Sequence, residues 1–137
     1  MLVSVRAALI ACVFFLLGAA PAWSQATADL PEGVEPMTFG VDTMTITTAN
    51  GRFVYDIEVA TTPQQQARGL MYRTSLGVNK GMLFIFPREQ MQAFWMANTL
   101  IPLDMVFIDA EARLVSIQRE AEPLSRTSRP SEGPARF

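Results

Sequence analysis

Large apolar side chains occupy every odd position from 53 to 59, and two of the three even positions between them are acidic. A period of two places alternate side chains on opposite faces of a β-strand. A β-prone run over residues 44–48 comes before this strand, and the pair Asn50-Gly51 joins the two. Asn-Gly is the strongest short-range hairpin signal. The pattern therefore predicts a β-hairpin over residues 44–59.

A short helix is predicted to follow the hairpin. Thr62 suits the N-cap, Pro63 suits the first helical position, and Gln65 stands three residues after the cap, as a capping box requires. The inward side of this helix would be formed by three apolar residues: Ala67, Leu70 and Met71.

Four further strands are predicted over residues 81–86, 92–97, 103–108 and 114–117. Pro102 cannot donate to a strand ladder and extends the residue before it, so segment 98–102 is predicted to be a connection. Strands outnumber helices, and most are joined by short turns. The chain therefore predicts a mainly β fold, a small antiparallel β-sandwich or open barrel with one short α-helix.

Residues 1–24 have the pattern of a secretory signal peptide, which we expect to form an N-terminal signal helix. Arg6 is its only charged residue, an apolar run follows, and the small residues Ala22 and Ser24 suit cleavage after Ser24. Cleavage after Ala22 or Ala26 is the close alternative. We therefore expect an exported protein, either periplasmic or secreted.

Two alternatives would keep the protein at the membrane. The leader could stay uncleaved as an anchor, although its apolar run is shorter than the ~20 residues of a membrane-spanning helix. Cys12 ends a Leu-Ile-Ala-Cys stretch that is similar to a lipoprotein cleavage box, but few apolar residues precede it. With an uncleaved leader, the leader alone would contact the membrane.

The composition of the rest of the chain predicts three parts: a spacer, a β-rich domain and a tail. Residues 25–39 hold prolines, a glycine and small polar residues without periodicity, which predicts a flexible spacer. The β-rich domain would then span residues 40–122. Residues 123–137 have a loop composition without a core-forming pattern, so we expect an irregular C-terminal tail there.

Charge and residue usage exclude several chemistries. The chain has 137 residues, a net charge of −2 and no run of Lys or Arg, so nucleic acid is not expected as a partner. It has no His, which removes the commonest general base and metal ligand. Its one Cys, Cys12, lies in the leader, so the mature domain would have neither a disulfide nor a thiolate ligand.

The most apolar stretch after the leader, residues 81–109, also contains polar residues that need a partner. Asp104 lies between two apolar residues, where we expect burial, and a buried carboxylate must be paired or hydrogen-bonded. It could accept backbone N–H groups near Pro102 or pair with Arg73. It could also serve in a cleft as a polar anchor or proton acceptor.

Asn98 and Thr99 follow an aromatic-rich strand in the same stretch. They could form local hydrogen bonds in a turn, or point into a pocket beside Trp95. The hypothetical ligand-binding set therefore has seven members: Arg73, Met82, Trp95, Met96, Asn98, Thr99 and Asp104.

No metal or cofactor is predicted. Methionine thioethers could hold Cu(I). However, Met is a common filler of irregular cores, and the four candidates are spread over three strands: Met82, Met91, Met96 and Met105. Three acidic residues match no calcium-loop spacing: Asp104, Asp109 and Glu111. The last two are expected in a solvated hairpin turn.

Three functions remain open. The leading hypothesis is an exported, non-enzymatic binding or accessory module whose partner is a small ligand or an envelope protein. The second is a hydrolase-like enzyme in which Asp104 is the general base and Asn98 or Arg73 stabilises an anion. The third is a buried polar network that only fixes the turn.

Three runs occur in a specific order: EVATTPQQQARGLMYR, then GMLFIF, then FWMANTLIPLDMVFID. Together they resemble the family called domain of unknown function 192, which consists of small, often exported proteins of bacteria and archaea. The resemblance covers about residues 43–122 and implies a compact, mainly β fold with a short helix, but no biochemistry. It would carry over these motif positions: Gly69, Leu70, Met71, Arg73, Gly81, Met82, Trp95, Met96, Asn98, Thr99, Pro102, Leu103 and Asp104.

The end of the chain departs from the family pattern. Members of that family usually continue past the Pro/Ser loop into a further strand pair. This chain stops at Phe137, about where that pair should begin. We therefore expect either a truncated sequence or a shorter member, and truncation would leave a neighbouring strand with an unpaired edge.

Overall fold

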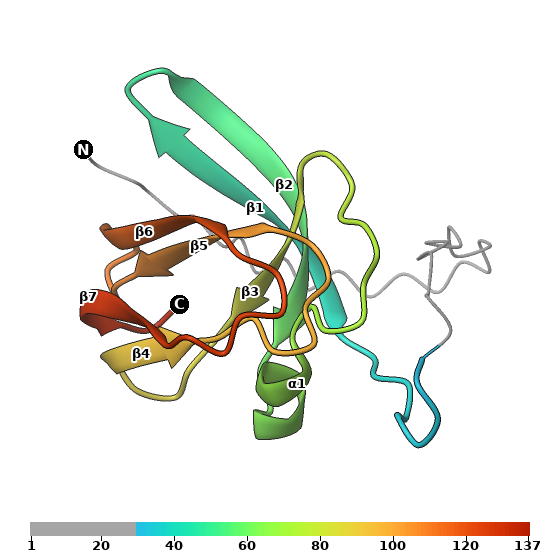
Figure 1. The fold of residues 1–137 in the computed structure, drawn as a ribbon. Coiled ribbons are helices and arrows are strands. Elements are labelled where there is room, and N and C mark those ends of the chain that lie inside the picture. Colours follow the sequence, from blue (N-terminus) through green and yellow to red (C-terminus); the bar gives the residue numbers. More distant parts are fainter. Residues whose placement is uncertain (1–29) are drawn as a thin grey trace.

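Residues 30–137 are described in the computed structural model, and they form seven β-strands and one α-helix (Figure 1). In chain order these are β1 (Gly40–Thr48), β2 (Gly51–Ala60), α1 (Pro63–Arg68), β3 (Lys80–Phe84), β4 (Gln90–Phe94), β5 (Leu103–Ile108), β6 (Leu114–Ala121) and β7 (Arg129–Ala135). The predicted signal helix lies outside the described residues. No helix within residues 30–137 is long and apolar enough to cross a membrane.

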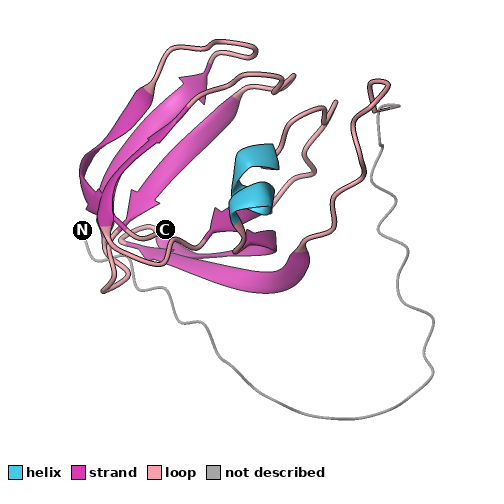
Figure 2. Cartoon of the chain, turned by 90° about the horizontal axis from the view of Figure 1, so that it is seen from below, coloured by secondary structure: helices cyan, strands magenta, loops and turns pink. Residues whose placement is uncertain are grey.

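The strands form three small sheets, which Figures 1 and 2 show from two sides. β1, β2 and β3 form one sheet in that order, β4 pairs with β7, and β5 pairs with β6. All pairs are antiparallel except β2 and β3, which are parallel and are joined through α1. The prediction of a mainly β, open and largely antiparallel fold with one short helix is confirmed.

The predicted hairpin is also confirmed. β1 and β2 pair from Gly40 and Val59 to Thr48 and Gly51, so Ala49 and Asn50 form the loop. Gly51 has a φ of 133°, a backbone conformation that residues with a Cβ atom rarely adopt. Asn50-Gly51 therefore marks the hairpin, with the glycine at the first position of the second strand.

The capping box of α1 forms as predicted. The Thr62 hydroxyl accepts a hydrogen bond from the Gln65 N–H at 3.2 Å, and Gln65 Oε1 accepts one from the Thr62 N–H at 3.1 Å. The helix ends at Arg68 because Gly69 turns the chain with a φ of 47°. A Cβ atom at Gly69 would lie 3.1 Å from Phe84, so the glycine also allows α1 to approach β3.

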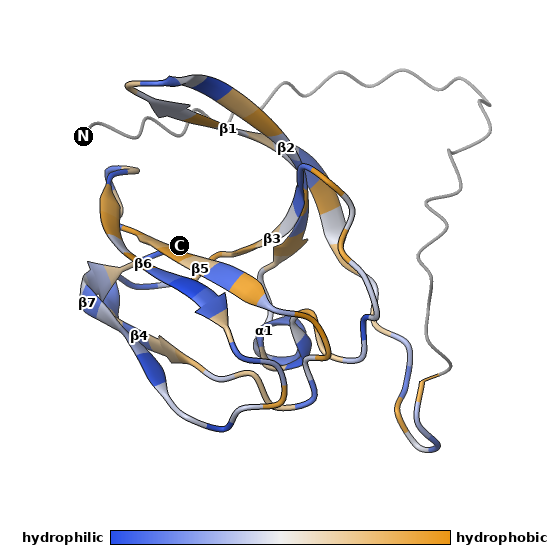
Figure 3. Cartoon of the chain, turned by 45° about the horizontal axis from the view of Figure 1, so that its top comes forward, coloured by the Kyte–Doolittle hydropathy of each residue, from blue (hydrophilic) through white to orange (hydrophobic). Residues whose placement is uncertain are grey.

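The centre of the fold is a cluster of phenylalanine rings drawn from all three sheets. The Phe94 ring on β4 lies 5.0 Å from that of Phe84 on β3 and 5.8 Å from that of Phe107 on β5, measured between centroids. Phe86 follows β3 and adds a third contact at 6.1 Å. Apolar residues recur along β2, β3 and β5 (Figure 3). The contacts between the phenylalanine rings join the separate sheets.

The prediction of an irregular tail over residues 123–137 is wrong, because residues 129–135 form β7 and pair with β4. Burial along β7 alternates with a period of two, but the inward residues are small: Ser131, Gly133 and Ala135. A pattern without large apolar side chains gives no hydrophobic signal. Pro130 and Pro134 also argue against a strand in the sequence, because proline cannot donate a backbone hydrogen bond. Proline is tolerated on edge strands.

Ser131 fastens β7 to β4. It is 2% exposed, and its hydroxyl accepts a hydrogen bond from the Gln92 N–H at 3.1 Å and donates one to the Gly133 carbonyl at 2.7 Å. Loss of the hydroxyl would leave the Gln92 N–H without this acceptor. The tail is therefore part of the folded unit.

We predict that Ser131→Ala lowers the free energy of unfolding by about 1–3 kcal/mol, the usual cost of a buried polar group left unsatisfied. Urea denaturation of the full chain measures the change. Ser128→Ala is the matched control, because Ser128 is exposed and lies before β7. Equal midpoints for the two variants would show that the Ser131 hydroxyl does not hold the strand pair.

Candidate functional site

Three loops meet at one end of the fold, and we call this region the loop end: residues 70–73, 95–102 and 122–126. Backbone hydrogen bonds join them. The Tyr72 N–H donates to the Asn98 carbonyl at 2.8 Å, the Met96 N–H donates to the Ser125 carbonyl at 2.8 Å, and the Leu124 N–H donates to the Thr99 carbonyl at 3.0 Å. Segments that are distant in sequence therefore hold each other in fixed positions.

Each of these loops contains a non-glycine residue with a positive φ. The values are 64° for Tyr72, 57° for Asn98 and 62° for Leu124. Asn adopts this conformation fairly readily, but Tyr and Leu do so at a cost. The hydrogen bonds between the loops supply the stabilisation that this backbone requires.

Apolar side chains at the loop end divide into buried and exposed sets. Met96 is fully buried, and Thr99 is only 5% exposed. Trp95 is 57% exposed, Leu100 43% and Leu124 59%. A buried layer thus supports large apolar side chains that are open to solvent.

The two polar residues of the turn differ in their roles. Thr99 is buried, and its hydroxyl donates to the Ala97 carbonyl at 3.4 Å, so it serves the turn itself. Asn98 is exposed. Its side-chain amide has one weak contact, from Nδ2 to the Met71 sulfur at 3.9 Å.

Arg73 does not pair with Asp104. Its guanidinium forms an ion pair with Glu58 on β2 at 2.6 Å and lies 5.8 Å from the centroid of the Phe39 ring. Both charged side chains of this ion pair are less than one-fifth exposed. Glu58 is distant in sequence from Arg73, and only the fold brings the two together.

The expectation that Asp104 is buried is also wrong. Along β5 the residues alternate, so that Leu103, Met105 and Phe107 turn inward while Asp104 is exposed. Its carboxylate accepts a hydrogen bond from the Glu120 N–H on β6 at 2.8 Å. Glu120 has a φ of 48°, so Asp104 holds a backbone conformation that is rare for a residue with a Cβ atom.

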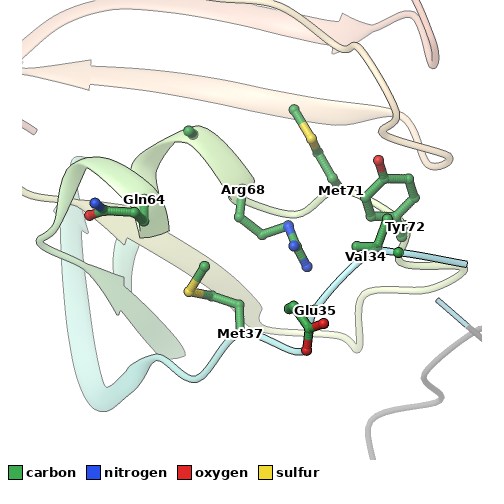
Figure 4. A pocket seen from close by; sticks show the side chains of 9 residues that line it. Val34, Glu35, Met37, Gln64, Arg68, Met71 and Tyr72 are labelled. Atoms are coloured by element: carbon green, nitrogen blue, oxygen red, sulfur yellow. The ribbon is translucent and has the colours of Figure 1, made fainter. Parts of the chain in front are cut away.

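A groove of about 490 Å³ lies beside the loop end, between residues 33–37 and the C-terminal half of α1 (Figure 4). Its lining includes Arg68, Met71 and Tyr72. None of the seven residues of the predicted ligand-binding set lines it, and Met82 lies half-buried on β3. No motif marks the groove, because one of its walls comes from the segment that was predicted to be a spacer.

Asp109 and Glu111 lie in the turn between β5 and β6 as predicted, but only Glu111 is well solvated, because the Asp109 side chain is 17% exposed. Arg113 pairs with Asp109 and with Glu111, each at 2.9 Å. The pKa of Asp109 lies below its usual value, chiefly because its carboxylate accepts the backbone N–H of Arg113. Within residues 30–137, no cluster of three or more His, Cys, Asp or Glu residues is arranged to hold a metal ion.

The structure is an open, mainly β domain in which backbone hydrogen bonds join three loops at one end. Residues 45–137 match the model of the family DUF192, domain of unknown function 192, which is described as an uncharacterized ACR. The chain belongs to this family, so the resemblance seen in its three sequence runs is confirmed. No curated protein matches the chain.

Two solved structures are similar to this one. A protein of unknown function from Novosphingobium aromaticivorans DSM 12444 is 40% identical, with a TM-score of 0.70 and 74% of each chain covered. A candidate transcription regulator from Sinorhizobium meliloti 1021 is 32% identical, with a TM-score of 0.71, and the match covers 74% of this chain and 80% of that chain.

We predict that Asp104→Ala lowers the free energy of unfolding by about 1 kcal/mol, because the Glu120 N–H loses its acceptor. Asp104→Asn keeps a carbonyl oxygen at the same place and should cost less. Thermal or urea denaturation measures both variants. Glu132→Ala, another exposed acid on a strand, is the control. If Asp104→Ala unfolds at the parent's midpoint, the bond to Glu120 does not stabilise the fold.

Proposed function

We propose that this domain is an exported binding or accessory module that holds a small ligand or an envelope protein at its loop end. The observation that carries the proposal is the position of Trp95. Its side chain is 57% exposed, although Met96 and Ala97 directly after it are buried. The largest apolar side chain of the loop end thus faces solvent from a loop whose backbone is held in place.

An exposed aromatic side chain on a loop with a fixed backbone suits binding for two physical reasons. Trp is among the residues most enriched at the energetic centres of interfaces, since its burial removes a large apolar area from water. A loop that is already fixed loses little conformational entropy when a partner binds. Leu100 and Leu124 are exposed at the same end and would add apolar contact area.

Asn98 supplies polar groups to the same surface. Its backbone carbonyl is used by the Tyr72 N–H, and its side-chain amide makes only the weak sulfur contact with Met71. The amide is therefore free to exchange hydrogen bonds with a partner. We propose that Trp95 and Asn98 contact the partner, and that Met96 and Thr99 support them from beneath.

A catalytic role for Asp104 has less support. Its carboxylate is exposed and already accepts a backbone hydrogen bond from β6. The contacts of Asp104 instead favour the structural role of fixing the backbone of Glu120.

The proposed cellular context rests on residues 1–24, whose single charge, apolar run and small residues suit a secretory leader. We do not propose nucleic-acid binding for this chain, although it is similar to a candidate transcription regulator. Nucleic-acid binding needs a basic surface that neutralises phosphates, whereas this chain has a net charge of −2 and no run of Lys or Arg.

The proposal predicts that full-length protein, expressed with its leader and purified under mild conditions, carries a bound species in native mass spectrometry. Trp95→Ala should lose this species and still unfold cooperatively. The matched control is Val78→Ala, which shortens an apolar side chain that is 91% exposed on the loop before β3.

Fluorescence gives a second readout of the same prediction. The chain has two tryptophans, so Trp23→Phe leaves Trp95 as the sole indole. Its emission should move to shorter wavelength when the bound species is added back, because the indole leaves water. If Trp95→Ala retains the species at the occupancy of Val78→Ala, the loop end is not the binding surface.

A further inference from the structure

The groove beside α1 has opposite charges on its two walls. Arg68 lies in the last turn of the helix, and Glu35 lies on the segment that crosses the helix (Figure 4). Within residues 30–137 no ion pair joins them, and neither side chain forms a hydrogen bond. The groove therefore presents a cation and an anion that do not neutralise each other by direct contact.

Arg68 is held in a position that suits a carboxylate. Its guanidinium carbon lies 5.7 Å from the centroid of the Tyr72 ring, and the side chain reaches from α1 toward the Val34–Glu35 segment (Figure 4). The residue is half-buried. A cation–π placement of this kind leaves the N–H groups at the edge of the guanidinium free to bind a carboxylate with two parallel hydrogen bonds.

The rest of the lining is apolar and adaptable. Met37, Met71 and Val34 are half-buried and line the groove between the two charges. Methionine side chains are flexible and polarisable, so they adjust to aliphatic or aromatic groups of different shapes. The polar end of a bound molecule would thus contact the charged residues of the groove, and its side chain would contact the methionine thioethers.

The segment that carries Glu35 is fastened to the helix. Gln65 Nε2 donates a hydrogen bond to the Thr38 carbonyl at 2.9 Å, and Gln65 is also the residue that closes the capping box of α1. The groove therefore has two walls that are joined near one end, with Arg68 on one wall and Glu35 on the other (Figure 4).

We propose that this groove binds a zwitterionic amino acid or dipeptide with a large apolar side chain. Arg68 binds the carboxylate, Glu35 binds the ammonium group, and the methionines contact the side chain. A simple anion fits less well, because Glu35 would repel it. The site goes beyond the proposed function, since Trp95 takes no part in it.

The test uses the full chain labelled with ¹³C at its methionine methyl groups, of which Met37 and Met71 are assigned by substitution with Leu. L-phenylalanine and L-alanyl-L-phenylalanine are the probes, and they distinguish a free amino acid from a peptide source. At least one should shift both methyl signals in a saturable way, with a Kd of about 1 mM, as expected for a small ligand in an open groove. The Trp95→Ala variant should bind equally well.

Ligand analogues test each charge on the unaltered protein. L-phenylalanine amide lacks the carboxylate and N-acetyl-L-phenylalanine lacks the ammonium group, so each should bind about tenfold more weakly, as the loss of a charged hydrogen bond implies. Arg68→Gln and Glu35→Gln should weaken binding of L-phenylalanine similarly. The controls Arg88→Gln and Glu132→Gln alter exposed residues away from the groove and should leave it unchanged.

Three results would overturn the proposal. The first is the absence of methyl shifts with either probe at several millimolar. The second is equal or tighter binding of N-acetyl-L-phenylalanine, which would define a simple anion site. The third is an affinity for L-phenylalanine that survives Arg68→Gln. Since the analogues act on the parent chain, a variant that fails to fold leaves the test intact.

Discussion

The packing of Phe94 against rings from two other sheets is the contact on which this fold depends. Each sheet of residues 30–137 has two or three strands, and such small sheets are marginal by themselves. Phe94 contacts Phe84 and Phe107, and so joins all three through one aromatic cluster, in which Phe107 is buried. The same contact fixes the end of β4, from which the chain continues directly into Trp95.

The loop end follows from that geometry. Because β4 ends at a fixed place, the Met96 N–H meets the Ser125 carbonyl, and the turn at Asn98 meets Tyr72. Loops that are held by distant partners can support positive φ values at bulky residues, which a free loop would relax. The exposed Trp95 is thus presented by a rigid backbone, and this supports a binding role more directly than its exposure alone.

Local patterns predicted much of the fold. The capping box at Thr62, the hairpin at Asn50-Gly51 and the bounds of β5 depend on neighbouring residues, and each was predictable from the sequence. β7 was not, because its inward positions are small rather than apolar. The family could be identified from three sequence runs, since each run can be read from the sequence without knowledge of the fold.

The candidate site was less predictable, because its contacts are distant in sequence. Arg73 pairs with Glu58 on β2, and no spacing rule connects them. Asp104 was expected to be buried because its neighbours are apolar, whereas the alternation of β5 turns it outward. The groove beside α1 joins a segment that lacks secondary structure to a helix, so no single run of residues could mark it.

Amide hydrogen exchange tests the central claim, that hydrogen bonds between three loops hold the surface around Trp95 rigid. Protection reports how often each bond opens. The account predicts that the N–H groups of Tyr72, Met96 and Leu124 exchange as slowly as those in the paired strands. Exchange at the rate of an exposed loop at all three positions would contradict it, because the loop end would then be mobile rather than preorganised.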